Sequence, residues 1–324
     1  MKNNQNTPLI ETRSLCKYFK VSSGQLHAVD NINVKIFPEK TLGVVGESGC
    51  GKTTLGRTIV QLLKPTSGHV LLQGERIDNL SMRKLRDKRK DIQIIFQDPY
   101  SSLDPRMTVS DIIAEYMIIN KTYKHKADIY KKVSELMDIV GLARRLSESY
   151  PHELDGGRLQ RVGIARTLSL NPKFIVCDEP VSALDVSIQA QILNLLMDLQ
   201  DEMGLTYMFV THDLSVIKHI SNEIMVMYLG QCVEMATTDE LFANPLHPYT
   251  QKLLSAIPIP DISMRTKKIE VIKGEVTSPI NPKPGCRFAP RCDFATDRCL
   301  GKDPDLITVN ENHKVACVLR EKMG

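Results

Sequence analysis

The sequence predicts an α/β fold built around a mostly parallel β-sheet, and three observations support this prediction. Short apolar stretches alternate with helical patterns, which is typical of parallel strands joined by crossover helices. A glycine-rich loop stands between one such stretch and a helical pattern, and another stretch ends in two carboxylates. Strands are expected at residues 43–45, 92–96, 173–177 and 206–210, and a hairpin at residues 223–234.

The glycine-rich loop covers residues 46–53 and has the spacing G-x-x-x-x-G-K-T. Glycines let backbone N–H groups close around phosphate, and the N-terminus of the following helix favours negative charge. Lys52 is expected to neutralise phosphate oxygens, and the hydroxyl of Thr53 to ligate Mg²⁺. The loop therefore predicts a nucleoside triphosphate site. Its members are Gly46, Glu47, Ser48, Gly49, Cys50, Gly51, Lys52, Thr53 and Thr54.

The carboxylates Asp178 and Glu179 follow the apolar stretch 174–177. The carboxyl end of a parallel strand is where an α/β sheet holds ligands. Asp178 suits the Mg²⁺ shell through water, because Mg²⁺ keeps several of its own waters. Glu179 suits the general base that polarises the water attacking a γ-phosphate. An acidic pair that only caps a strand is the alternative, and the phosphate loop in the same chain disfavours it.

Residues 98–160 are predicted to form a helical subdomain inserted into the sheet domain. Gly141 is expected to end its central helix. From residue 257 onwards, prolines interrupt a stretch with little periodicity, so a boundary is expected near residue 260. The apolar positions with helical spacing in the insertion are Ile129, Val133, Leu136, Met137 and Val140.

Composition places the chain among ordinary soluble proteins. Its 324 residues carry a net charge of +4, with 25% charged residues, which gives no indication of a nucleic-acid partner. The dense basic run at 83–90 fits a solvated helix face, with contact to anionic lipid or nucleic acid as the alternative. No signal peptide is visible, and no apolar stretch approaches the ~18 residues of a membrane span. A cytoplasmic chain is expected, with any membrane role dependent on partners.

Together with three further motifs, these residues resemble the ATP-binding subunits of ABC transporters over nearly the whole chain. Gln97 matches the family's Q-loop glutamine, which senses Mg²⁺ and nucleotide. Residues 182–185 match its D-loop and end in Asp185. His212 matches the switch histidine, where a neutral imidazole can hydrogen-bond the γ-phosphate.

The resemblance implies a P-loop NTPase fold of the ABC type over residues 1–260, with a small cysteine-bearing extension over residues 261–324. It also implies ATP hydrolysis with Glu179 and His212 as catalytic residues. ATP and Mg²⁺ are the implied ligands. The implied Mg²⁺ contacts are Thr53, Gln97 and Asp178.

An aromatic pair precedes the phosphate loop by some 30 residues, where the resembled family stacks a ring on adenine. The pair is Tyr18 and Phe19. The spacing favours Phe19, with Tyr18 as a close alternative. A ring that simply packs the N-terminal sheet is the other interpretation.

The family's signature, usually Leu-Ser-Gly-Gly-Gln, differs in this chain. Its positions are occupied by Leu154, Asp155, Gly156, Gly157 and Arg158. In the family the serine reaches across a dimer to the γ-phosphate on the partner's loop. Aspartate caps a helix as well as serine does, but an ionised carboxylate cannot donate a hydrogen bond. At about 4 Å and an effective dielectric near 20, its repulsion with phosphate is on the order of 4 kcal/mol.

Arg158 can offset this repulsion, either by pairing with Asp155 or by reaching the phosphate itself. A homodimer would carry two impaired signatures, whereas a related partner with an intact signature would serve this chain's phosphate loop. The hypothesis is therefore an asymmetric heterodimer with a paralogous ATPase subunit.

Residues 97–105 and 245–254 resemble the oligopeptide, dipeptide and nickel importers among ABC transporters. This resemblance implies uptake of peptides or nickel, two transmembrane permease subunits and an extracellular substrate-binding protein. It also implies a peripheral position on the cytoplasmic face of the membrane, and no nucleic acid partner. An ABC ATPase of DNA repair or translation is disfavoured, because this chain has neither a second ATP domain nor a long insertion. The cysteine-bearing extension disfavours an exporter ATPase.

Four of the eight cysteines follow the pattern C-x5-C-x6-C-x17-C in the extension. They are Cys286, Cys292, Cys299 and Cys317. Four thiols suit tetrahedral Zn²⁺ or a [4Fe–4S] cluster, and the spacing lacks the C-x2-C pairs common in zinc sites. Some members of the resembled subfamily carry an iron–sulfur cluster on a similar set, which favours iron. Zinc and free or redox-labile thiols remain alternatives. Either metal would stabilise a segment too short to build its own core.

Overall fold

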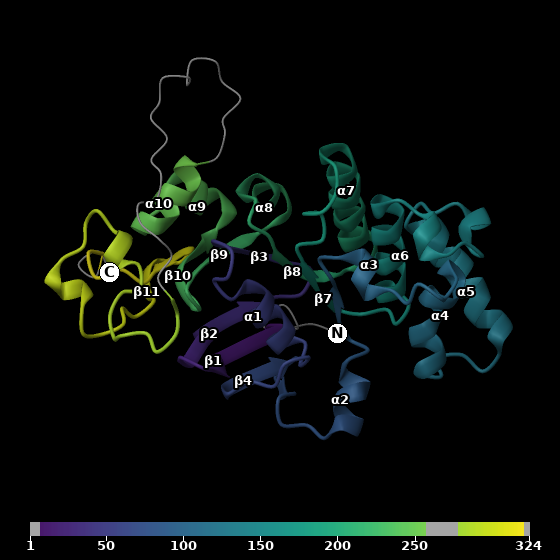
Figure 1. Cartoon of the computed structure of the whole chain (residues 1–324), viewed down its shortest axis with the longest axis horizontal. Helices are drawn as coiled ribbons and strands as arrows, with labels where there is room; N and C mark the ends of the chain where they lie inside the picture. Colours follow the sequence, from purple (N-terminus) through teal and green to yellow (C-terminus); the bar gives the residue numbers. More distant parts are fainter. Residues whose placement is uncertain (1–6, 257–277, 321–324) are drawn as a thin grey trace, which may run out of the picture. The chain divides into compact units, whose positions relative to one another are not determined.

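The computed structural model describes residues 7–256 and 278–320, and these fall into two compact units (Figure 1). The first unit comprises residues 7–9, 36–40 and 79–210. The second comprises residues 10–35 and 41–78 and the described residues after 210. Among the described residues, no helix combines the length and apolar character that crossing a membrane requires.

The first unit contains three parallel strands: β6 (Ile92–Ile95), β7 (Phe174–Asp178) and β8 (Thr206–Val210). Strand β7 lies in the middle, and its Val176 is paired with Ile94 of β6 and Met208 of β8. Every residue of β7 and β8 is buried, as expected for parallel strands covered on both faces. These three predicted strands are confirmed.

A group of helices in the first unit confirms the predicted helical segment after residue 98. Helices α4, α5 and α6 pack against one another (Figure 1). Helix α5 buries the predicted apolar face, and Gly141 follows it with a φ of 68°. The helices are α3 (Pro99–Ser102), α4 (Val109–Ile119), α5 (Lys126–Ile139) and α6 (Gly156–Leu168), with 3-10 turns at Arg144–Leu146 and Pro151–Glu153.

Two more helices complete the first unit, α2 (Met82–Lys88) and α7 (Val186–Met203). The basic run of the sequence forms α2 and the turn after it. Leu85 is the buried residue of this helix, and its basic side chains lie outside the core. The run thus forms an exposed helix face, as both interpretations of it require.

The second unit contains an antiparallel sheet in the order β2 (Gly24–Ile36), β1 (Ile10–Val21), β4 (Ser67–Leu72) and β5 (Glu75–Arg76). It also contains β3 (Thr41–Val45), which pairs in parallel with β9 (Glu223–Tyr228). Strand β9 forms the predicted hairpin with β10 (Gln231–Thr237). The helices of this unit are α1 (Lys52–Ile59), α8 (Leu214–Ile220), α9 (Thr238–Ala243) and α10 (Pro248–Ser255).

The described part of the extension, residues 278–320, adds two strands to β10. Strand β12 (His313–Val315) pairs with β10, and β11 (Ile307–Asn310) pairs with β12 (yellow in Figure 1). The 3-10 turns Ala289–Arg291 and Asp297–Cys299 precede them. Strands of three and four residues carry too little periodicity to be predicted. The boundary predicted near residue 260 lies outside the described residues.

Side chains from the extension also enter the core of the second unit. The ring of Phe288 lies 5.3 Å from both Tyr228 of β9 and Tyr249 of α10, measured between ring centroids. The buried carboxylate of Glu234 accepts a hydrogen bond of 2.7 Å from the imidazole of His313. The extension is therefore joined to the body of the unit by strand pairing, aromatic packing and a buried polar contact.

Candidate nucleotide site

The phosphate loop has the predicted strand–loop–helix arrangement, running from β3 to α1. Gly51, the N-cap of α1, has a φ of 105°, and a Cβ placed on it would lie 1.9 Å from the carbonyl oxygen of Ala28. Gly46 has a φ of 151°, and its Cβ would lie 2.2 Å from the oxygen of Met227. Only glycine fits these two positions, because a side chain meets both a left-handed backbone and a neighbouring carbonyl.

The side chain of Lys52 is buried within the phosphate loop to which it belongs. Its ammonium donates hydrogen bonds to the carbonyl oxygens of Gly46 and Glu47, at 2.8 and 3.0 Å. The backbone N–H of Glu47 in turn donates to the hydroxyl of Tyr249, at 2.8 Å. The loop thus holds a fixed positive charge at its centre, which suits an anion such as a phosphate group.

The aromatic pair lies on β1 in the same unit as the phosphate loop. Tyr18 stacks on His27 with ring centroids 3.9 Å apart, and its hydroxyl donates to Asp30 at 2.5 Å. Phe19 instead lies under the ammonium of Lys17. Successive side chains of a strand point to opposite faces, so the two rings face different surroundings.

Asp30 is the shared acceptor beneath Tyr18. Burial by itself would raise the pKa of this carboxyl, but hydrogen bonds from Tyr18 and His27 and the charge of Arg287 hold its pKa below the usual value. The carboxyl group of Asp30 therefore stays ionised. The hydrogen bond that it accepts from the Tyr18 hydroxyl fixes the orientation of the Tyr18 ring. His27 precedes Ala28, whose carbonyl oxygen is the one that Gly51 approaches.

His212 belongs to the second unit and is exposed. The residue before it, Thr211, donates its N–H to the oxygen of Val44 on β3, at 3.2 Å. The residue after it, Asp213, caps α8 by accepting from the N–H of Ser215 at 2.8 Å. His212 is thus held at a fixed position between the end of β3 and the start of α8.

In the first unit the structure brings Gln97 and Glu179 together, although 82 residues separate them. The side-chain amide of Gln97 donates to a carboxylate oxygen of Glu179 at 2.9 Å. Asp178 is buried at the end of β7. Glu179 has a φ of 49°, and its N–H donates to Val210. A non-glycine residue in this conformation costs energy and is typical of functional sites.

The altered signature begins helix α6. Asp155 is its N-cap and accepts from the backbone N–H of Arg158 at 2.8 Å. The other carboxylate oxygen lies 3.4 Å from the guanidinium of Arg158. The predicted cap is confirmed, and of the two alternatives for Arg158 the structure shows the pairing with Asp155. Arg145, Arg158 and Arg161 line a cleft of about 340 Å³ together with Asp155, so basic side chains surround the carboxylate.

The glycines of the signature lie close to the D-loop helix within the first unit. A Cβ on Gly157 would lie 2.7 Å from the side chain of Ile188, and one on Gly156 would lie 3.1 Å from that of Leu184. Asp185 is the N-cap of α7. The signature and the D-loop thus pack as neighbours.

The predicted site residues divide between the two units. The phosphate loop, the aromatic pair and His212 lie in the second unit, whereas Gln97, Asp178, Glu179, the signature and the D-loop lie in the first. The predicted Mg²⁺ shell of Thr53, Gln97 and Asp178 draws on both units and stays a prediction.

The four cysteines of the extension line one small cavity together with apolar side chains that include Phe288 and Val318. All four are free thiols. Burial raises the pKa of Cys286 to about 11. Across residues 7–256 and 278–320, no three or more histidine, cysteine, aspartate or glutamate side chains are arranged to hold a metal ion. The four thiols share one cavity but are not arranged as a metal site in the described residues, so the [4Fe–4S] cluster and the Zn²⁺ alternative stay predictions.

Sequence reasoning missed two arginines of the extension that contact the candidate nucleotide site. Arg291 pairs with Glu47 of the phosphate loop, and Arg287 pairs with Asp30. Tyr249 lies in the stretch 245–254 that carries the subfamily resemblance, and its hydroxyl accepts a hydrogen bond from the phosphate loop. Sequence separations of 244 and 257 residues leave no local signal for the two arginine pairs.

A glycine-bounded loop around a buried lysine, set between a strand and a helix, defines a P-loop nucleotide-binding protein. Two family models match the chain: ABC transporter over residues 29–182, and the oligopeptide/dipeptide transporter C-terminal region over residues 233–299. The chain belongs to the ABC transporter family, among the ATP-binding proteins of oligopeptide and dipeptide transport. It is an ABC-type ATPase.

Similar proteins match nearly the full length of the chain. The oligopeptide transport ATP-binding protein OppF of Salmonella typhimurium is 48% identical, over 97% of each chain. AppF of Bacillus subtilis, also an oligopeptide transport ATP-binding protein, is 48% identical over 98% of each. Among solved structures, cbiO1 of Clostridium perfringens, part of the ABC transporter complex cbiONQ, has a TM-score of 0.65 at 28% identity and covers 74% of this chain and 92% of its own.

Proposed function

We propose that this chain supplies ATP hydrolysis to an importer of peptides. The observation that carries the proposal is the joining of an ABC transporter domain to an oligopeptide/dipeptide transporter C-terminal region in one chain. The relatives named above are transport proteins for oligopeptides, and a Haemophilus influenzae relative at 47% identity is named for dipeptides. Peptides are therefore favoured over nickel as the substrate class.

The proposed partners are two transmembrane permease subunits, an extracellular substrate-binding protein and a paralogous ATPase subunit. The chain would lie on the cytoplasmic face of the membrane, bound to the permease. ATP hydrolysis by the purified complex in the presence of the binding protein tests the substrate class. Stimulation by a mixture of short peptides is expected, and stimulation by Ni²⁺ but not by peptides would reject the proposal.

In the proposed mechanism, Lys52 neutralises phosphate oxygens, while Thr53 and Asp178 contribute to the Mg²⁺ shell. Glu179 accepts a proton from the attacking water, with its carboxylate oriented by Gln97. His212 hydrogen-bonds the γ-phosphate. Closure of two ATPase subunits on ATP, and their reopening after hydrolysis, would drive the permease.

Tyr18 is the aromatic side chain that we assign to the adenine ring, in place of Phe19, which the spacing favoured. The support is the fixed orientation of Tyr18 on His27 and Asp30, next to the stretch of β2 that the phosphate loop contacts. A planar ring held in this way loses little entropy when a base stacks on it.

We further propose that the chain works in an asymmetric pair, because Asp155 is an impaired substitute for the signature serine. Its two oxygens are already engaged by Arg158, and an ionised carboxylate has no proton to donate to phosphate. The partner's signature would complete the site built on this chain's phosphate loop. The three arginines around Asp155 would soften the repulsion at the opposite site without supplying the missing donor.

Replacing Asp155 with serine is expected to raise ATP turnover of the assembled complex severalfold, because the serine restores a donor and removes a like charge. Asp155→Asn is the matched control for charge, since asparagine keeps the helix cap and carries no charge. It is expected to give part of the increase. Turnover unchanged in both variants would show that the opposite site does not depend on this signature.

The cysteine cavity is proposed to hold a [4Fe–4S] cluster, with Zn²⁺ as the alternative. The support is a set of four thiols around one cavity in a segment with a small core of its own. A bound metal would keep the thiols deprotonated and cross-link the segment.

Protein purified without oxygen is expected to contain about four iron and four sulfide per chain, with broad visible absorption. Replacing Cys299, which is buried in this segment, with serine is expected to abolish both. One zinc per chain and no visible absorption would show a structural zinc site instead of an iron–sulfur cluster. Absence of any metal would reject both the cluster and the zinc site.

A further inference from the structure

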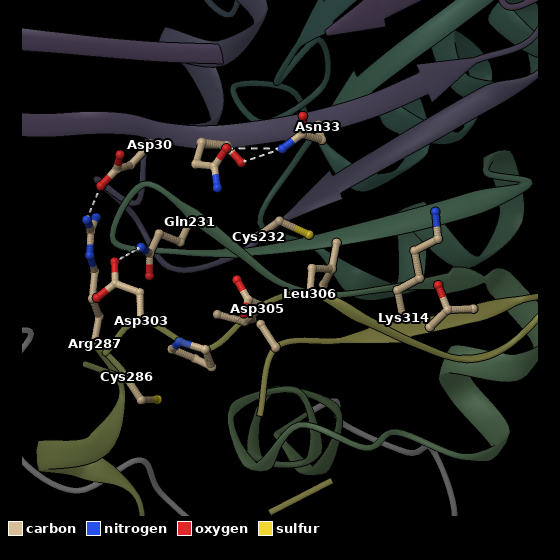
Figure 2. A pocket seen from close by; sticks show the side chains of 15 residues that line it. Asp30, Asn33, Gln231, Cys232, Cys286, Arg287, Asp303, Asp305, Leu306 and Lys314 are labelled. Carbon is tan, nitrogen blue, oxygen red and sulfur yellow. Dashed lines mark hydrogen bonds and ion pairs between the residues drawn. The ribbon is translucent and has the colours of Figure 1, made fainter. Parts of the chain in front are cut away.

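The extension reaches the nucleotide site through two arginines that lie between two of its cysteines. Arg287 directly follows Cys286, and Arg291 directly precedes Cys292. The side chains of both arginines are 5% exposed, so both charges are buried and each is paired with a carboxylate. Figure 2 shows Arg287 reaching Asp30, with Cys286 beside it on the chain.

Arg291 is bound to the phosphate loop by a two-pronged contact. Its two terminal nitrogens donate to the two carboxylate oxygens of Glu47, at 2.7 and 3.1 Å. One of them also lies 3.3 Å from the hydroxyl of Tyr228. Parallel hydrogen bonds between a guanidinium and a carboxylate fix orientation as well as distance.

Glu47 links Arg291 to Lys52, the lysine of the phosphate loop. The carbonyl oxygen of Glu47 accepts from the ammonium of Lys52, and its N–H donates to Tyr249. The backbone of Glu47 is thus held by Tyr249 and its side chain by Arg291, so a shift of Arg291 would move a carbonyl that positions Lys52. Arg291 contacts the loop from outside and acts through Glu47.

Arg287 makes a similar ion pair near the aromatic residue Tyr18. It pairs with Asp30 and donates to the carbonyl oxygen of Leu229. Asp30 also accepts from the hydroxyl of Tyr18 and lies 3.1 Å from His27, on which the Tyr18 ring is stacked. Arg287 therefore acts through Asp30 on Tyr18.

We propose that Arg287 and Arg291 are positioning residues through which the C-terminal extension sets the affinity of the chain for ATP. Arg291 positions the phosphate loop, and Arg287 positions the aromatic platform. The part that concerns Tyr18 rests on the proposed adenine contact.

The test compares binding of ATP and of tripolyphosphate to the full-length chain, by competition with a fluorescent ATP analogue. Arg291→Gln is expected to weaken both ligands about tenfold, because both need the phosphate loop. Arg287→Gln is expected to weaken ATP about tenfold and tripolyphosphate less than twofold, because tripolyphosphate has no base. Lys302→Gln is the matched control, since its pair with Asp305 is exposed and lies in the same extension.

A double-mutant cycle separates positioning from general destabilisation. Glu47→Gln combined with Arg291→Gln is expected to bind ATP no more weakly than the worse single variant, whereas independent structural damage would add. Arg291→Lys, which keeps the charge but not the two-pronged contact, is expected to fall between wild type and Arg291→Gln. Melting temperatures are measured beside each affinity.

Three results would be decisive. Unchanged ATP affinity in both arginine variants would overturn the inference, provided that the wild-type chain binds ATP. If Arg287→Gln weakened the binding of ATP and of tripolyphosphate equally, the proposed action of Arg287 on Tyr18 would be overturned. Failure of the wild-type chain itself to bind ATP would instead reject the nucleotide site on which the inference depends.

Discussion

Glu179→Gln is expected to lower ATP turnover of the assembled transporter by at least about 100-fold, the usual contribution of a general base. Glutamine has the same shape as glutamate but cannot accept the proton of the attacking water. Gln97 would keep a partner in the variant, because the new side chain retains an oxygen acceptor. ATP binding is therefore expected to persist, and turnover and binding are measured on the same preparation.

Two comparisons sharpen this experiment. Glu202→Gln, which removes an exposed carboxylate from α7, is the control and should leave turnover unchanged. If the proposed asymmetric pair is right, the equivalent change in the paralogous subunit is expected to cost less than Glu179→Gln, since the site on this chain's phosphate loop would be the competent one. Equal losses in the two subunits would contradict the asymmetric pair.

Gly51→Ala is expected to abolish detectable ATP binding and to lower the melting temperature. The new methyl group would lie 1.9 Å from the carbonyl oxygen of Ala28, in a residue whose φ is 105°. Gly49→Ala is the matched control in the same loop. Its φ is also positive, at 77°, but apart from its chain neighbours no atom of the described residues lies within 4 Å of the added carbon.

The control variant therefore carries backbone strain alone, roughly 1–2 kcal/mol, and is expected to retain measurable ATP binding. Nucleotide titration and thermal melting of both variants check the prediction. Similar behaviour of the two would show that contact with Ala28 does not hold the phosphate loop, and that left-handed backbone strain explains the whole effect.

The parallel strands could be predicted because they are short apolar runs with clear boundaries, whereas the antiparallel sheet of β1, β2, β4 and β5 was not predicted. Strand β8 was predicted at its observed bounds, and α5 ends before Gly141 as its spacing requires. The phosphate loop could be predicted because the residues that define it are eight consecutive positions of the sequence. By contrast, β11 and β12 are too short to show alternation, and they gain their stability from pairing at β10.

The parts of the site that could not be predicted are contacts between distant segments. Arg291 pairs with Glu47 although 244 residues separate them in the sequence, and neither residue type nor local spacing predicts that pairing. The proposed choice of Tyr18 over Phe19 rests on a contact of the same kind. Spacing along the chain favours Phe19, whereas the stacking of Tyr18 on His27 depends on how β1 and β2 lie against each other.

Uptake of labelled peptide into vesicles that contain the purified complex tests most directly whether this ATPase powers peptide import. With ATP supplied on the side of this chain, peptide is expected to accumulate, and accumulation is expected to stop in the Lys52→Ala complex. Accumulation that persists in that variant, or steady ATP hydrolysis without any peptide uptake by the wild-type complex, would contradict the proposed function.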